Sequence, residues 1–210
     1  MTMAENRFLL YFILVEAFLF GTFFGTLAFE RSSGLAGLFY GFYVYITPVL
    51  LLGLCLTDPA LRDKLRSLIV SSDLIILIVV IIGWGIAWLY LGLSPWGLFF
   101  PYAFIDELNF RFVFQNKISA YAGRGRAVIL QAIAFTALYS SYVIFETAGY
   151  PGLFLPLFFL DMFGMGMLYG ALYYLRGNIY SDIAIHISLY AMIPLLPAYL
   201  GFIPYSLLPT

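Results

Sequence analysis

The sequence predicts an all-α polytopic membrane protein, in which residues 1–210 form a single integral membrane domain of seven to eight transmembrane helices. Hydrophobic residues make up 63% of the chain and charged residues only 10%, and the mean hydropathy is +0.98. An average soluble domain carries about 25% charged residues, so these few charges could not cover a water-soluble surface. The aromatic content of 20% excludes a disordered chain. The single cysteine, Cys55, excludes a disulfide-linked scaffold.

Each predicted span is an apolar run of about 20 residues, the length that crosses a bilayer as a helix. The first run is too long for a signal peptide, and no small-residue cleavage site follows it before Glu30, so we expect it to remain as a helix. The last run is predicted to form one tilted helix or two shorter ones, because Pro194, Pro197 and Pro204 interrupt it. In chain order, the predicted spans cover residues 8–29, 34–56, 68–92, 97–115, 127–147, 151–175 and 178–207.

The basic residues predict the orientation of these spans. Eight of them fall on one side of the membrane if the N-terminus is cytoplasmic, whereas the other side has only Arg31, and Arg111 lies within a span. The positive-inside rule therefore predicts a cytoplasmic N-terminus and cytoplasmic even-numbered loops. We interpret the basic loops as topology determinants, because headgroup or nucleic-acid binding would need denser charge. The eight residues are Arg7, Arg62, Lys64, Arg66, Lys117, Arg124, Arg126 and Arg176.

Two pairs of glycines lie four residues apart within the predicted spans. They are Gly21 with Gly25, and Gly166 with Gly170. This spacing allows two helices to approach closely. We interpret both pairs as contacts between helices of the same chain.

Two pairs of ionisable residues stand at helical spacing inside the spans. A charge in the bilayer costs about 2.5–3.5 kcal/mol on insertion scales and is by default a functional candidate. Glu107 and Arg111 are four residues apart, so a helix would bring them together as an ion pair. On a purely structural interpretation, Arg111 neutralises the carboxylate and lets the helix insert. Asp182 and His186 share a helix face, so Asp182 could bond the imidazole and hold it in one tautomer.

Three more carboxylates are expected to differ in their surroundings. Glu16 and Asp73 lie near span ends or glycine-rich faces, where they could reach water, so a structural role is predicted for both. Asp161 lies near the middle of the sixth span and is expected to be better buried.

Two stretches of the chain carry recognisable motifs, Asp106-Glu107-Leu-Asn-Phe-Arg111 and the segment from Phe163 to His186. Both resemble the CAAX prenyl protease and bacteriocin-processing (CPBP) family of intramembrane proteases. The first, Asp106-Glu107-Leu-Asn-Phe-Arg111, is similar to the family motif Glu-Glu-x-x-x-Arg. The second runs from Phe163 to His186 and resembles the family's glycine-rich helix, its short turn and the helix that carries its last catalytic histidine. The resemblance covers about residues 95–192 and implies a CPBP-like helical core.

The resemblance also implies a chemistry, in which a glutamate activates water for attack on a peptide carbonyl while histidines and an asparagine assist. Three matching positions differ here. Asp106 replaces the glutamate expected to act as base, Tyr139 replaces a histidine, and Tyr190 replaces the asparagine. The matching residues that are retained are Glu107, Arg111 and His186.

These replacements decide the order of the functional hypotheses. Loss of one acid/base group or oxyanion donor typically costs about 10²–10⁴ in rate. We therefore predict a non-catalytic or strongly diverged CPBP-like protein that acts as a membrane scaffold or accessory subunit. The first alternative is an active intramembrane protease that uses Asp106 or Glu107 as base and His186 as acid or oxyanion donor. The second is a transporter subunit with a proton path through Glu16, Asp161 and Asp182, although no internal repeat supports it.

The sequence predicts neither a cofactor nor a metal. His186 is the only histidine, so a two-histidine metal site within one chain is excluded. A site built from Asp106, Glu107 and His186 stays open. The expected partners are the lipid bilayer and either other membrane subunits or a membrane-embedded peptide. With a net charge of −1, no nucleic-acid partner is expected.

Overall fold

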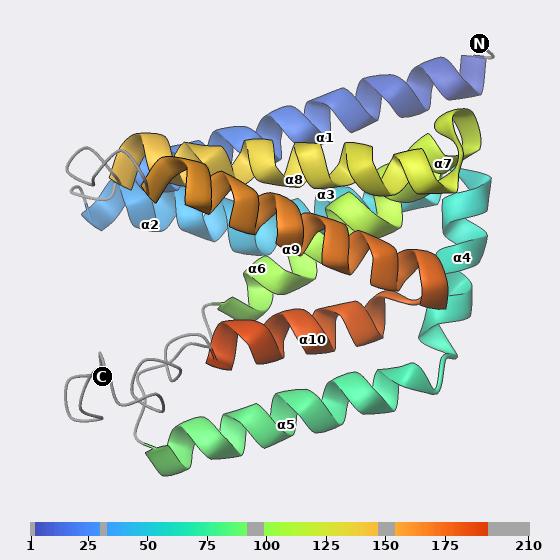
Figure 1. Ribbon diagram of the computed structural model, residues 1–210. Helices are drawn as coiled ribbons and strands as arrows, with labels where there is room; N and C mark the ends of the chain where they lie inside the picture. Colours follow the sequence, from blue (N-terminus) through green and yellow to red (C-terminus); the bar gives the residue numbers. More distant parts are fainter. Residues whose placement is uncertain (1–2, 30–32, 92–98, 147–153, 193–210) are drawn as a thin grey trace.

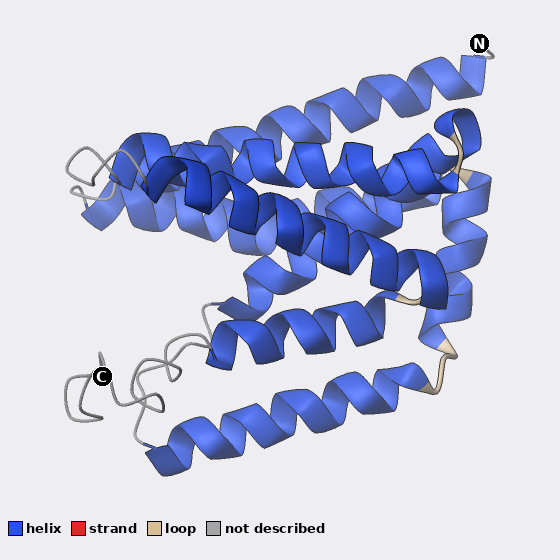
Figure 2. Ribbon diagram, in the orientation of Figure 1, coloured by secondary structure: helices blue, strands red, loops and turns tan. Residues whose placement is uncertain are grey.

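The computed structural model describes residues 3–29, 33–91, 99–146 and 154–192, and within these ranges every regular element is helical (Figures 1 and 2). Two rods each contain a π-helical stretch, η1 or η3, flanked without a break by α-helices. The elements are α1 (Met3–Ala28), α2 (Ser33–Gly41), η1 (Phe42–Ile46), α3 (Thr47–Thr57), α4 (Pro59–Ile69), α5 (Asp73–Leu91), α6 (Phe99–Asp106), η3 (Glu107–Gln115), α7 (Asn116–Ala122), α8 (Arg124–Glu146), α9 (Phe154–Arg176) and α10 (Ile179–Met192).

The chain is an integral membrane protein, and its helices confirm the all-α class. Three helical stretches of the described chain are long and apolar enough to cross a bilayer, Glu5–Ala28, Gly34–Thr57 and Pro156–Arg176. A fourth is reached if α4 and α5, bent by 64° at their junction, count as one broken span. The prediction of seven to eight spans is thus not confirmed. The helix over 97–115 falls short because polar and charged side chains interrupt it, and only Ile179–Met192 of the last predicted span is described as helix, with its three prolines outside the described residues.

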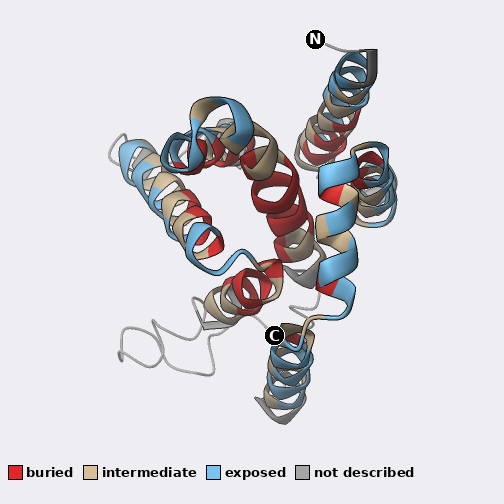
Figure 3. Cartoon of the chain, turned by 90° about the vertical axis from the view of Figure 1, so that its right-hand side faces the viewer, coloured by how far each residue is buried: buried red, intermediate tan, exposed pale blue. Residues whose placement is uncertain are grey.

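The rod α6–η3–α7 provides the centre of the bundle. The η3 segment contacts α3, α8, α9 and α10, and every residue of it except Phe114 is buried. Figure 3 shows buried helical segments, drawn in red, surrounded by the other helices. By contrast, α5 lies at the edge of the bundle beside α10 (Figure 1).

The predicted basic loops gather at one end of the bundle. The N-terminus of α1, the whole of α4, α7, the start of α8 and the end of α9 all lie at the right-hand end in Figure 1. The helix α4 crosses this end, and the Asp58 side chain caps it by accepting a hydrogen bond from the Leu61 backbone N–H at 3.0 Å. This arrangement supports the predicted one-sided charge distribution, while the cytoplasmic placement of this end stays a prediction.

A tight turn aims α10, the helix that carries His186, back into the bundle. Gly177 ends α9 with a φ of +67°, a left-handed conformation that glycine adopts without steric cost. Asn178 then accepts a hydrogen bond from the Tyr180 N–H at 2.9 Å and donates to the Asp73 carboxylate at 2.8 Å. The first bond caps α10 and the second fixes its start to the start of α5, so Asp73 has the structural role that was predicted.

Close packing of α8 on α9 depends on the second glycine pair. A Cβ on Gly166 would lie 2.9 Å from the Ala132 Cα, and one on Gly170 would collide with the Gln131 amide. Of the first pair, a Cβ on Gly25 would meet the ring of Phe39, whereas Gly21 has open space beside it. Gly25, Gly166 and Gly170 thus make the predicted intramolecular contacts.

We expect Gly166→Leu to destabilise the folded protein by about 1–3 kcal/mol, because the new side chain forces α8 and α9 apart. Gly164→Leu is the matched control, since this glycine is exposed on the same helix and nothing lies within 4 Å of the Cβ it lacks. Thermal unfolding of the detergent-solubilised protein measures both. Equal midpoints for the two variants would contradict the assignment of Gly166 to this contact.

Candidate active site

Glu107, the first residue of η3, joins two other charged or ionisable side chains in the interior. Its Oε1 lies 2.8 Å from His186 Nδ1, and its Oε2 lies 3.3 Å from Arg111 Nε. All three side chains are 0–2% exposed. The predicted ion pair between Glu107 and Arg111 is therefore present. With Glu107 ionised, the Nδ1–H of His186 donates to it, which selects that tautomer.

The prediction that Asp182 could hold the imidazole is wrong. Asp182 is fully buried one turn before His186, but neither of its carboxylate oxygens has a hydrogen-bond partner. Glu107 takes that position instead, since η3 packs directly on α10. Tyr169 of α9 stacks on the other side of the imidazole, with ring centroids 4.4 Å apart at 23°.

Aromatic rings surround the guanidinium of Arg111. Its Cζ lies 4.7 Å from the ring centroid of Phe135 and 5.1 Å from that of Tyr169. Its two terminal nitrogens are buried without a hydrogen-bond partner. Ring faces carry negative electrostatic potential and attract a cation, so the rings partly replace the water that Arg111 loses.

Asp106, at the position of the expected base, is bound to the residue that replaces a family histidine. The Tyr139 hydroxyl donates to Asp106 Oδ2 at 2.6 Å. The Asp106 side chain is 0% exposed to bulk solvent, and its Oδ1 has no hydrogen-bond partner among the described residues. Tyr139 is in turn fixed by ring contacts with Phe135 and Phe23, at centroid separations of 4.8 and 5.6 Å.

The structure thus brings five of the six predicted site residues into one cluster. Three elements supply the cluster: the α6–η3 rod, α8 and α10. The side chain of the sixth residue, Tyr190, lies outside the described residues. The five are Asp106, Glu107, Arg111, Tyr139 and His186.

Sequence reasoning missed Tyr169, which contacts both Arg111 and His186. One signal could have indicated Tyr169. It lies three residues after Gly166, on the helix face that meets α8 and η3. Sequence reasoning also missed Asn109, whose Nδ2 donates to Glu16 Oε2 at 3.3 Å. This bond connects Glu16 of α1 to η3, while the structural role expected of Glu16 stays a prediction.

The expectation that Asp161 is better buried is wrong. Asp161 is exposed on α9, because the face of this helix that packs on α8 is the one that carries Gly166 and Gly170. Glu16 is held by η3, and Asp182 is buried on α10. Within the described part of the chain, no hydrogen bond or ion pair joins these three carboxylates, so the structure offers the proton-path hypothesis no support.

The described residues contain no group of three or more His, Cys, Asp or Glu side chains placed to hold a metal ion. The open alternative of a site from Asp106, Glu107 and His186 therefore receives no support. In the described structure Asp106 is bound to Tyr139, whereas Glu107 is bound to His186 and Arg111.

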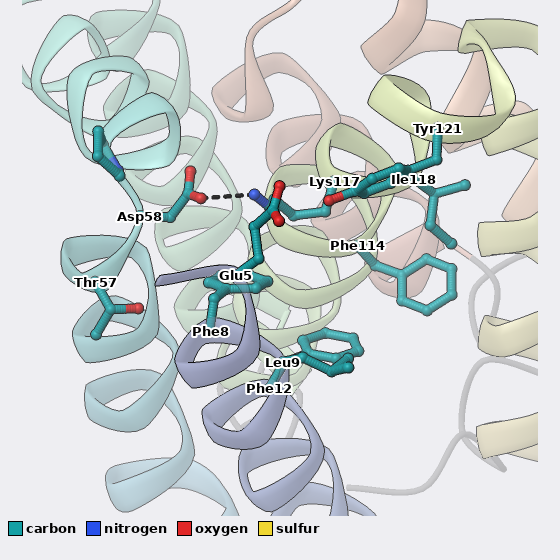
Figure 4. A pocket seen from close by; sticks show the side chains of 11 residues that line it. Glu5, Phe8, Leu9, Phe12, Thr57, Asp58, Phe114, Lys117, Ile118 and Tyr121 are labelled. Carbon is teal, nitrogen blue, oxygen red and sulfur yellow. Dashed lines mark hydrogen bonds and ion pairs between the residues drawn. The ribbon is translucent and has the colours of Figure 1, made fainter. Parts of the chain in front are cut away.

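A cavity of about 500 Å³ lies away from this cluster, at the basic end of the bundle (Figure 4). Phe8, Phe12 and Phe114 form part of its apolar wall. At its edge the Lys117 ammonium pairs with Asp58 Oδ2 at 2.6 Å, which ties α7 to the start of α4. None of the predicted site residues lines this cavity.

A buried carboxylate, an arginine and a histidine thus lie together on two facing helices. In the comparison with protein families, residues 93–192 match the family model described as Type II CAAX prenyl endopeptidase Rce1-like. Over this region, somewhat less than half of the chain, the protein is similar to the CAAX prenyl protease and bacteriocin-processing family. No curated protein and no solved structure matches it.

We expect Glu107→Gln to destabilise the protein by about 3–5 kcal/mol, because it leaves the Arg111 charge buried without a counter-charge. Asp63→Asn is the control, since Asp63 pairs with Arg66 while both side chains are more than 70% exposed. Exposed pairs contribute at most about 1 kcal/mol. Denaturant unfolding in detergent compares the two, and a similar loss in both would show that the Glu107 contacts contribute no more than a surface pair.

Proposed function

We propose that this protein is a non-hydrolytic or strongly diverged member of the CAAX protease-like family that acts as a membrane scaffold or accessory subunit. One observation carries the proposal: the carboxylate of Asp106 is bound to the Tyr139 hydroxyl at 2.6 Å and has no surface exposed to bulk solvent. A general base must reach the water or group whose proton it takes. Asp106 reaches a phenol instead.

The replacement of histidine by Tyr139 also removes proton-transfer capacity. An imidazole has an unperturbed pKa of about 6.5 and exchanges protons near neutral pH, whereas a phenol has one of about 10. Phe23 and Phe135 hold the Tyr139 ring in place, so the phenol is fixed as a donor to Asp106. This pair therefore supports a structural link between α6 and α8 rather than a water-activating site.

The surface of the bundle supports a scaffold role. Large apolar side chains are exposed along the outer face of α5, which packs on α10 with its other side. In a bilayer such a face contacts either lipid or the helix of another membrane protein. The exposed side chains on α5 are Ile75, Ile76, Ile78, Val79, Ile81, Ile82 and Ile86.

An active protease is the second candidate, and one contact favours it. The 2.8 Å contact between Glu107 and His186 is a carboxylate–imidazole pair of the kind that orients a general acid or base. If the protein is an enzyme, it is an endopeptidase of this family and acts on a membrane-embedded peptide.

We expect the purified wild-type protein to show no turnover of a prenylated peptide or of a single-span peptide. The triple variant Asp106→Glu, Tyr139→His, Tyr190→Asn restores the family motif residues and should gain measurable hydrolysis, since each restored group contributes about 10²–10⁴ in rate. Product formation is followed by mass spectrometry, and an active family member is the positive control. Ser67→Ala, a change at an exposed residue of α4, controls for preparation.

Wild-type turnover that disappears in both Asp106→Ala and His186→Ala would overturn the proposal and establish the protease. Both variants must elute as the wild type does on size-exclusion chromatography, so that lost activity is not mistaken for lost folding. Wild-type protein that is inactive and yet co-purifies with a membrane partner supports the scaffold.

A further inference from the structure

A second, smaller cavity of about 200 Å³ opens at the basic end of the bundle. It lies where α4, the η3–α7 junction, the start of α8 and the end of α9 come together. It differs from the apolar cavity of Figure 4 in the character of its wall, which is mostly polar. Its polar lining includes the side chains of Lys64, Gln115, Asn116, Arg124 and Tyr173.

Two cations face this cavity without a counter-charge. None of the described residues that line it is acidic. Lys64 donates to the neutral Asn116 Oδ1 at 2.8 Å and lies 4.8 Å from the ring centroid of Tyr173. Burial lowers the pKa of Lys64, and the nearby Arg124 charge lowers it further. By contrast, Lys117 on the other side of α7 is neutralised by Asp58. An anion in the cavity would relieve the repulsion between Lys64 and Arg124.

Two neutral side chains of the cavity, Tyr173 and Gln115, favour a ligand that has hydrogen-bonding groups as well as a negative charge. The Tyr173 hydroxyl accepts from Asn116 Nδ2 at 2.7 Å, which leaves its own O–H to donate to an oxyanion. Gln115 is only 4% exposed; its Nε2 donates to the Gly170 carbonyl at 2.9 Å, whereas its Oε1 has no partner. A buried acceptor without a donor costs about 1–3 kcal/mol. A ligand that carries both an oxyanion and a hydroxyl would accept from the Tyr173 hydroxyl and donate to Gln115 Oε1.

We propose that this cavity binds a phosphate group that carries a neighbouring hydroxyl, the chemistry of a glycerophosphate headgroup. Lys64 and Arg124 pair with the phosphate oxygens, Tyr173 donates to one of them, and a ligand hydroxyl donates to Gln115 Oε1. Guanidinium and ammonium groups bind phosphate as charge-assisted donors. Either an anionic phospholipid at the membrane surface or a soluble glycerophosphate has this chemistry. The site is distinct from the buried cluster and does not depend on whether that cluster hydrolyses peptides.

Binding is measured on the full-length protein in a neutral detergent, by thermal shift and native mass spectrometry. Phosphatidylglycerol is the probe with both groups, phosphatidylmethanol lacks the hydroxyl, phosphatidylcholine lacks the net charge, and glycerol 3-phosphate lacks the chains. We expect phosphatidylglycerol to bind more tightly than phosphatidylmethanol or phosphatidylcholine. Comparable binding of glycerol 3-phosphate would identify a soluble ligand, whereas binding of phosphatidylglycerol alone would identify a lipid; both results support the headgroup chemistry.

Lys64→Met with Arg124→Met should weaken phosphatidylglycerol binding by about a hundredfold or more, because each of the two charged donors contributes about tenfold or more. Arg66→Met, on the same helix but exposed and paired with Asp63, is the charge-matched control for the lysine and should leave binding unchanged. Because Arg124 is exposed, Arg124→Met alone carries the test if the double variant does not fold. Gln115→Met should reduce the preference for phosphatidylglycerol over phosphatidylmethanol.

Equal losses in Arg66→Met and Arg124→Met would show nonspecific surface attraction and overturn the proposal. So would binding that is unaffected when both Lys64 and Arg124 are replaced, or a preference for phosphatidylcholine.

Discussion

Glu107 forms an ion pair with Arg111 through one carboxylate oxygen and a hydrogen bond with His186 through the other, and all three side chains are buried. A buried guanidinium without a carboxylate would be strongly unfavourable. The contact therefore determines how α10 can sit against η3, and it fixes where Phe135 and Tyr169 must lie to cover the arginine. The packing of the interior follows from one carboxylate that has two partners.

Much of the fold could be predicted from the sequence, because apolar runs indicate membrane helices and basic loops indicate which ends of the helices lie together. The ion pair at four-residue spacing and the grouping of Asp106, Tyr139 and His186 also followed from motif positions. The π-helical form of η3, in contrast, leaves no pattern in residue type. The partner of His186 was mistaken for Asp182 because helical spacing identifies neighbours on one helix, whereas Glu107 reaches His186 from another helix. The burial of Asp161 was wrong for a related reason: hydropathy cannot tell which face of a helix meets lipid.

The basic residues show how tertiary structure adds meaning that a count of charges lacks. In the sequence, Lys64 and Arg124 belong to separate loops and serve the positive-inside rule equally well. In the structure they face one polar cavity, whereas Lys117, from the same loop as Arg124, is neutralised by Asp58. The basic loops carry too few charges along the sequence to predict an anion site. Anion binding depends instead on how close the charged side chains lie in the folded protein.

The division between retained and replaced motif residues has a structural explanation that requires no catalysis. Glu107 pairs with both Arg111 and His186, so replacing Glu107 removes the partner of two buried side chains, and replacing either of the others removes a partner of Glu107. Asp106 and Tyr139 form their own pair through Oδ2, in which the Tyr139 hydroxyl has a buried acceptor and Asp106 Oδ1 has no partner. A protein that no longer hydrolysed peptides would still need Glu107, Arg111 and His186 in order to insert and pack. It could replace the other motif residues with any two side chains that hydrogen-bond each other. The residues that remain are those on which folding depends, so their presence alone is no evidence for hydrolysis.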